Sequence, residues 1–307
     1  MTGTSSAQAV RLAAAAAILL GGGYAVAELQ ETPPSQSAAS GPQPAPSPGP
    51  GAGHHEGPSG AGHQHEGDDH AAHTNGDGRT RSAAGYSLRD LRLAEGVLTF
   101  RIHNDRSGRS ETSFPVVHTK QLHMFVISSD LGSFRHVHPD AMRSGRWRVR
   151  LPELEPGEHR VVTEFSPASE HGAAVMLGAP VTVPGKHAEQ RVPPPANTTT
   201  VDGYTVTVDA NLLAGRTTQI GIAIDQDGSP PTLKPYLGSW SHVALVHADT
   251  LAVTHLHPLE EYATGTASPE ALTVNASTGP PGDYRLIVEF ATATGLHQAE
   301  LTLSASR

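Results

Sequence analysis

The sequence predicts an all-β protein with two tandem antiparallel β-sandwich domains, and three observations support this. Its 307 residues include 32 glycines and 25 prolines, a content typical of short strands joined by many turns. Apolar and polar residues alternate in short segments, with turn residues about every 8 to 12 positions. One histidine-containing phrase occurs in each half of the chain, so duplication of a whole domain is the simplest account. This strand and turn spacing favours sandwiches of the immunoglobulin-like type.

Residues 1–29 are expected to be a targeting segment. The apolar run Leu12 to Ala27 follows Arg11 and, at 16 residues, is shorter than the about 20 needed to span a membrane. It ends in Ala25-Val26-Ala27, which is typical of a signal-peptide cleavage site. An uncleaved hydrophobic helix that anchors the chain in the membrane is the alternative. Both interpretations predict an extracytoplasmic protein, either secreted or anchored to the outer face of the cytoplasmic membrane.

Residues 30–81 are expected to form a disordered linker rich in proline, glycine and histidine. The segment has too few apolar residues to form a packed core. Its histidines are His54, His55, His63, His65, His70 and His73. Two interpretations stay open: a loose metal-binding tract, or a solvated polar linker with no selected role.

The first β-sandwich is expected over residues 82–185 and the second over 199–307, joined by a proline-rich linker at 186–198. Each has about the 100 residues usual for such a domain. The segment Pro281 to Phe290 repeats Pro156 to Phe165 position by position. Expected strands of the first sandwich include residues 97–102, 146–151, 159–165 and 175–183.

The repeated phrase places three histidines in each domain at the same spacing. The second histidine follows the first by 13 residues and the third follows it by 15. Side chains two apart on a strand share a face, so the second and third histidines point the same way. A turn midway, at Asp130 in the first copy, allows strand pairing that brings the first histidine beside the third. The two predicted triads are His123, His136 and His138, and His242, His255 and His257.

Three imidazoles on one patch predict a copper or zinc site, because nitrogens about 2.0–2.1 Å from the ion are typical of such sites. Additional ligands or supporting residues are sought among His118, Asp130 and His171 in the first domain and His297 in the second. The strand around His123 is apolar on both faces, which indicates that its second face is covered by other protein, with the other domain the suggested cover.

The composition of the chain argues against several types of metal ligand, partner and activity. The chain has no cysteine, which excludes disulfides and thiolate ligands and leaves imidazole, carboxylate and thioether groups as metal ligands. A net charge of −9 argues against nucleic acid and an anionic membrane surface as partners. Because no catalytic motif such as G-x-S-x-G occurs, we do not expect an enzyme. A hydrolase or oxidase built on a histidine site is the third hypothesis.

The segments Lys120 to Pro139 and Tyr236 to Pro258 resemble a bacterial family of exported or membrane-anchored two-domain β proteins. The resemblance covers about residues 85–305 and implies copper or heavy-metal handling. In that family the second motif ends His-Val-His-Pro, whereas here Leu256 separates the two histidines. The predicted function is therefore metal binding, with copper favoured over zinc, to buffer or deliver the ion. The alternative is a cell-envelope module that binds another envelope protein and whose histidines are structural.

Overall fold

The computed structural model describes residues 75–168 and 173–307, which belong to one compact unit. This part of the chain is all-β, as predicted, and every sheet in it is antiparallel. None of its helices could cross a membrane, because none is both long and apolar enough. The predicted targeting segment, nearly all of the linker with its six histidines, and His171 lie outside the described residues.

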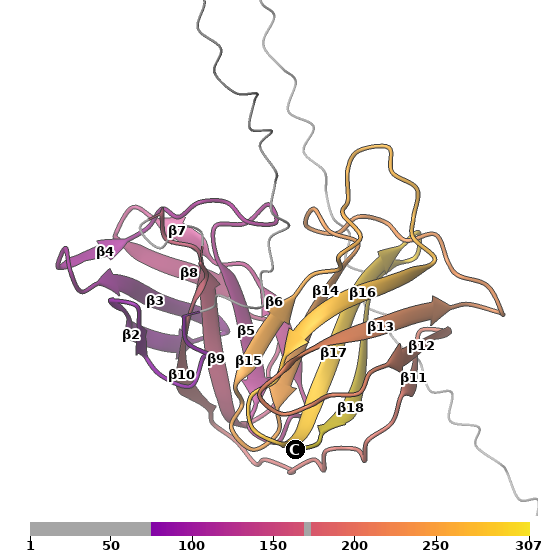
Figure 1. The fold of residues 1–307 in the computed structure, drawn as a ribbon. Coiled ribbons are helices and arrows are strands. Elements are labelled where there is room, and N and C mark those ends of the chain that lie inside the picture. The colour runs from indigo at the N-terminus through magenta and orange to yellow at the C-terminus, as the bar shows by residue number, and fades with distance from the viewer. Residues whose placement is uncertain (1–74, 169–172) are drawn as a thin grey trace, which may run out of the picture. The chain divides into compact units, whose positions relative to one another are not determined.

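The first sandwich has two sheets (Figure 1). One has the order β1-β2-β3-β8-β7, with β4 paired to β3, and the other has the order β10-β9-β5-β6. The strands are β1 (Ser82–Ala83), β2 (Tyr86–Ala94), β3 (Val97–Asn104), β4 (Arg109–Glu111), β5 (His123–Ser128), β6 (Phe134–Val137), β7 (Asp140–Met142), β8 (Arg146–Arg150), β9 (Gly157–Phe165) and β10 (Val175–Val183).

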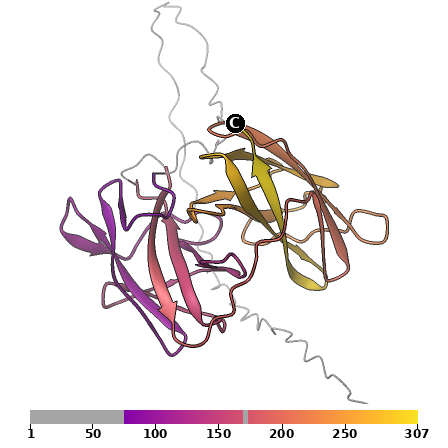
Figure 2. The ribbon, with the colours of Figure 1, turned by 90° about the horizontal axis from the view of Figure 1, so that it is seen from below.

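The second sandwich repeats this plan, and Figure 2 shows its two layers from below. The sheets have the orders β11-β12-β13-β16 and β15-β14-β17-β18. The strands are β11 (Thr198–Val201), β12 (Tyr204–Asp209), β13 (Thr217–Asp225), β14 (Ser241–His247), β15 (Val253–Leu256), β16 (Ala271–Ser277), β17 (Gly282–Thr292) and β18 (Gly295–Ala305).

The strand orders are those of immunoglobulin-like sandwiches, in which one sheet contains the first, second and fifth strands of the domain and the other contains the third, sixth and seventh. In the first sandwich these correspond to β2, β3 and β8 in one sheet and to β5, β9 and β10 in the other. Each sandwich has its own apolar core between its sheets. Phe100, Trp147 and Phe165 are buried in the first core. Trp240 and Phe290 are buried in the second core. Duplication of one domain plan therefore accounts for the described fold.

A third apolar cluster joins the two sandwiches. Strand β5 is buried along its whole length: Met124 and Val126 point into the first core, while Phe125 and Ile127 point away from it. The outward-facing side chains meet those of the second sandwich in a cluster that contains Phe125, Ile127, Leu131, Phe134, Val162, Met176, Ala244, Val246, Val253 and Ile287. The prediction that the other domain covers the second face of this strand is confirmed.

Candidate metal centre

Two β-hairpins bring the histidines of each phrase together. In the first, the β5–β6 ladder ends at the pair Met124 and Val137, so the next opposed positions are His123 and His138. Their ring centroids are 5.0 Å apart. In the second, the β14–β15 ladder ends at Val243 and Leu256, which places His242 opposite His257 with ring centroids 4.7 Å apart. The strand register predicted from the sequence is confirmed in the first sandwich and recurs in the second.

The nitrogens of the second triad converge on one point. The Nδ1 atom of His242 lies 3.3 Å from Nε2 of His255 and 3.1 Å from Nε2 of His257. Nitrogens about 2.0 Å from a tetrahedral metal ion are about 3.3 Å from one another, because a tetrahedron's edge is about 1.6 times its centre-to-corner distance. The spacing in this triad therefore fits a bound copper or zinc ion.

The first triad is less regular. The Nδ1 atom of His123 lies 3.1 Å from Nε2 of His136. The ring of His138 is near both, with its centroid 4.7 Å from that of His136. Its buried Nε2 atom has no hydrogen-bond partner in the described structure. The group that converges here is His123, His136 and His255, with ligand atoms within 4.8 Å of one another. The structure thus combines two predicted residues of the first triad with one of the second.

Backbone carbonyls fix which nitrogen each leading histidine presents. The Nε2–H group of His123 donates to the carbonyl of Val117 at 3.1 Å, and that of His242 donates to the carbonyl of Tyr236 at 3.1 Å. A carbonyl can only accept a hydrogen bond, so each Nε2 carries the proton. The lone pair of each neutral ring is then on Nδ1, the atom that faces the other histidines.

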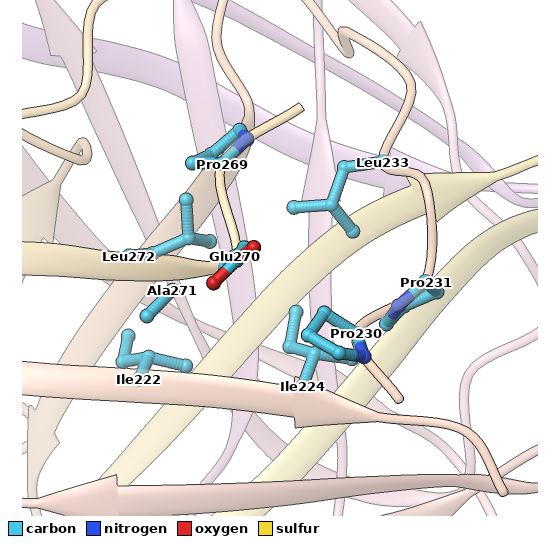
Figure 3. Close-up of a pocket in the computed structure, with 9 residues that line it drawn as sticks. All are labelled: Ile222, Ile224, Pro230, Pro231, Leu233, Pro269, Glu270, Ala271 and Leu272. Atoms are coloured by element: carbon cyan, nitrogen blue, oxygen red, sulfur yellow. The ribbon is translucent and has the colours of Figure 1, made fainter. Parts of the chain in front are cut away.

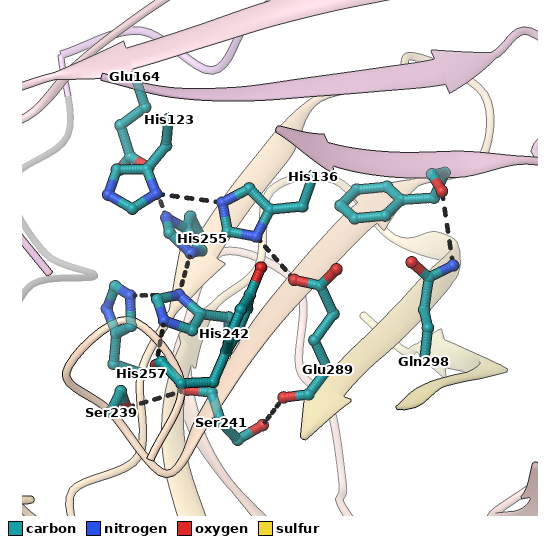
Figure 4. Close-up of polar contacts among 12 residues, drawn as sticks. His123, His136, Glu164, Ser239, Ser241, His242, His255, His257, Glu289 and Gln298 are labelled. Atoms are coloured by element: carbon teal, nitrogen blue, oxygen red, sulfur yellow. Dashed lines mark hydrogen bonds and ion pairs between the residues drawn. The ribbon is translucent and has the colours of Figure 1, made fainter. Parts of the chain in front are cut away.

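Two glutamates reach across the domain interface to orient the central histidines (Figure 4). Glu289 lies opposite His242 in the sheet of the second sandwich, but its Oε2 atom is 2.7 Å from Nδ1 of His136 in the first. Reciprocally, Glu164 lies opposite His123, and its Oε2 atom is 2.5 Å from Nδ1 of His255. A carboxylate on one ring nitrogen is the arrangement that holds a metal-binding histidine with its other nitrogen towards the ion.

Burial keeps four rings of the cluster neutral. Burial first, and then the neighbouring histidines, lower the pKa of His123 to about 3 and that of His242 to about 2. The same two causes lower the pKa of His138 to about 2 and that of His255 well below its ordinary value. Burial also raises the pKa of Glu164 to about 8. Neutral imidazole is the form that binds metal, so these four rings are in the metal-binding form at neutral pH.

His118 lies beside the second triad, although it belongs to the first sandwich. Its ring stacks on His257 with centroids 3.6 Å apart, and it meets His242 edge-on at 5.7 Å. It lies in a tight turn closed by reciprocal backbone hydrogen bonds between Val117 and Lys120. The candidate ligand predicted for the first domain therefore adjoins the triad of the second.

Asp130 and His297 do not join the cluster, contrary to the sequence-based expectation. Asp130 follows the far end of β5, about 20 Å of strand from His123. Its carboxylate accepts hydrogen bonds from the backbone of Gly132 and Gln190 and pairs with His187. His297 lies opposite Phe290, on the sheet face that points into the second core. Its Nδ1 atom bonds to Asp202 at 2.8 Å.

Glu164 and Glu289 were not predicted as site residues, although the sequence carries a signal for them. Each occupies the same position in the duplicated segment, just before a buried phenylalanine, in an otherwise apolar central strand. A carboxylate in such a strand needs a buried partner. The partner could not be assigned, because it lies in the other domain, 153 residues away for Glu289 and 91 for Glu164.

The space around the cluster is closely packed. A pocket between Phe125, His136, His242 and Glu289 has a free volume of about 0 Å³, so it admits no water-sized group. A second pocket, in the second sandwich, is walled by Ile222 and by residues such as Pro230 and Leu272 (Figure 3). Its free volume of about 10 Å³ holds at most one water molecule. Neither pocket offers room for an organic ligand.

Comparisons with known proteins give little functional information. Residues 199–307, about a third of the chain, match a family described as "Domain of unknown function (DUF8832)". No curated protein matches.

Three solved structures resemble the chain at low TM-scores. A tetra-tandem repeat from the extending region of a large adhesion protein is 8% identical, with a TM-score of 0.21 over 76% of this chain and 48% of that one. A protein of Corynebacterium diphtheriae described as membrane anchored is 8% identical, with a TM-score of 0.21 over 72% of this chain and 56% of that one. Chicken CNTN1 domains FN1–FN3 are 11% identical, with a TM-score of 0.19 over 77% and 64%. The chain therefore spans between about half and two thirds of the structures it matches.

Proposed function

We propose that the protein binds copper, or alternatively zinc, outside the cytoplasm and buffers or delivers the ion. The observation that carries this proposal is the convergence of three imidazole nitrogens at His242, His255 and His257, two of them 3.1 and 3.3 Å from Nδ1 of His242. Imidazole ligands suit both copper and zinc, and the chain offers no thiolate. The close packing supports storage or transfer of an ion rather than catalysis, which needs an open coordination position.

Metal binding is tested with the full chain in which the six linker histidines are replaced by glutamine. This variant, the linker-silenced protein, removes the background of the histidine-rich tract while keeping both sandwiches. After titration with Cu(II) or Zn(II) and removal of free ion, elemental analysis gives the bound metal per chain. We expect stoichiometric binding that His242→Asn and His257→Asn reduce and that His103→Asn, in β3 of the first sandwich, does not. The absence of stoichiometric metal would overturn the proposal.

The second candidate is a cell-envelope interaction module whose histidines are structural. It is favoured by the bonds from His123 and His242 to the carbonyls of Val117 and Tyr236, which brace two tight turns without any ion. On this account, His138→Ala lowers the melting temperature of the linker-silenced protein but leaves its metal content unchanged. On the metal-binding account, the same substitution changes the metal content.

A further inference from the structure

The two triads lie as close to each other as their own members do. Within them, ring centroids are 4.5 Å apart for His255 and His257 and 5.3 Å apart for His123 and His136. Across the interface, His255 lies 5.2 Å from His136 and 5.3 Å from His123. The histidines therefore form one continuous cluster between the sandwiches.

His255 takes part in both groups of converging ligand atoms. One group joins it to His242 and His257, and the other joins it to His123 and His136, in each case with all ligand atoms within 4.8 Å of one another. If each group held an ion about 2.0 Å from its nitrogens, the two ions would lie no more than about 9 Å apart. This limit is the sum of two metal–nitrogen bonds and the 4.8 Å that separates the ligand atoms of a group.

The interface supplies one acidic group for each of two ions. Two cations in a buried site are unfavourable unless anions lie beside them. Glu164 and Glu289 place one carboxyl group on each central histidine, and each comes from the opposite sandwich. In their ionised forms these two groups would offset part of the charge of two ions, one on each side of the interface.

We infer that the six phrase histidines form one paired centre that holds two copper or zinc ions side by side between the sandwiches, with His255 bordering both. This inference rests on the proposed metal-binding function. It replaces the picture of two independent sites, one per domain, with a centre that exists only when the two sheets are packed together. Each ion then depends on residues from both halves of the chain.

Electron paramagnetic resonance of the linker-silenced protein loaded with Cu(II) tests the pairing. We expect two coppers per chain and a signal that is broadened or reduced relative to the copper content, because neighbouring spins interact. His138→Asn should leave one copper and restore a full isolated-ion signal, while His103→Asn should leave the paired signal unchanged.

The remaining outcomes separate the two proposals. Two coppers per chain with the full signal of isolated ions would overturn the pairing and leave metal binding intact. One copper per chain in the parent protein would do the same. No stoichiometric copper would overturn the metal-binding function, and the pairing with it. Circular dichroism of each variant confirms that the sandwiches remain folded.

Discussion

The second triad is convergent, whereas the first is open on one side. His242 has both of its partners within 3.3 Å, and His118 stacks on His257 to hold that ring. In the first triad, His123 is bonded to His136, but the buried Nε2 atom of His138 has no hydrogen-bond partner in the described structure. The two copies share the spacing of their histidines, so spacing alone does not account for the difference.

The turn before the first histidine is one place where the surroundings of the two triads differ. His118 and Leu237 occupy equivalent turn positions, and both have left-handed backbone conformations, with φ of 47° and 51°. Only His118 carries a ring that reaches the opposite triad. We therefore expect the triad of the second sandwich to fill first and to bind its ion more tightly.

The largest expected effect comes from removing the residue common to both groups. His255→Asn should abolish the tighter ion and weaken the other, because its nitrogen adjoins both triads. His138→Asn, at the edge of the first triad, should remove only the weaker ion. Metal per chain after titration of the linker-silenced protein measures both. Equal losses from the two substitutions would show that the triads do not differ as described.

The crossed carboxylates should give the next largest effect. Glu164→Gln removes the carboxyl group that orients His255, so metal affinity should fall about 10- to 100-fold, as is usual for such partners. Glu289→Gln should weaken the ion held by His136 instead. Competition with a chromogenic chelator measures the metal affinity of each variant. The account is contradicted if Glu164→Gln weakens only the ion of its own sandwich.

A smaller effect is expected from exchanging the turn residues. His118→Leu should lower the affinity of the second triad by a few-fold, since it removes the ring stacked on His257 but no converging ligand atom. The reverse change, Leu237→His, tests whether a ring in that turn orders the first triad. Isothermal titration of each variant provides the measurement. Unchanged metal affinity in His118→Leu would show that this turn residue does not cause the difference between the two triads.

The smallest and most gradual effect is on the pH dependence of stability without metal. Burial lowers the pKa of His123 and His242 in the folded state, so the unfolded chain binds more protons below pH 6.5. Stability should therefore fall as the pH drops from 6.5 towards 3. The raised pKa of Glu164 acts in the opposite direction between about pH 4.5 and 8. Below pH 6.5 the four histidines outweigh this single group, whereas from pH 6.5 to 8 Glu164 makes stability fall as the pH rises, so stability should be greatest near pH 6.5. Urea unfolding at several pH values tests this, and stability that rises on acidification below pH 6.5 would contradict it.

Much of this architecture could be predicted because it depends on local rules. Alternation of side chains places Met124 inside and Phe125 outside, and the turn at Asp130 sets the register that opposes His123 and His138. The covered outer face of β5 followed from its apolar residues on both sides. These features depend on residues close together in the chain.

The remaining features could not be predicted because they depend on how the two sandwiches pack. Glu164 and Glu289 act on histidines of the opposite domain, and His118 adjoins the opposite triad. No periodicity within a single domain encodes such contacts. Asp130, a predicted auxiliary ligand, does not join the cluster, because its carboxylate contacts Gly132, Gln190 and His187. The hairpin instead extends the aspartate away from the histidine end.

X-ray absorption of the copper-loaded, linker-silenced protein tests the central claim most directly. The account predicts a coordination sphere of about three imidazole nitrogens at about 2.0 Å, with the multiple-scattering pattern of histidine rings. Replacing His242 with asparagine should reduce that pattern, while His103→Asn should leave it unchanged. A sphere of carboxylate or water oxygens, or one unaffected by the loss of His242, would contradict coordination by this cluster.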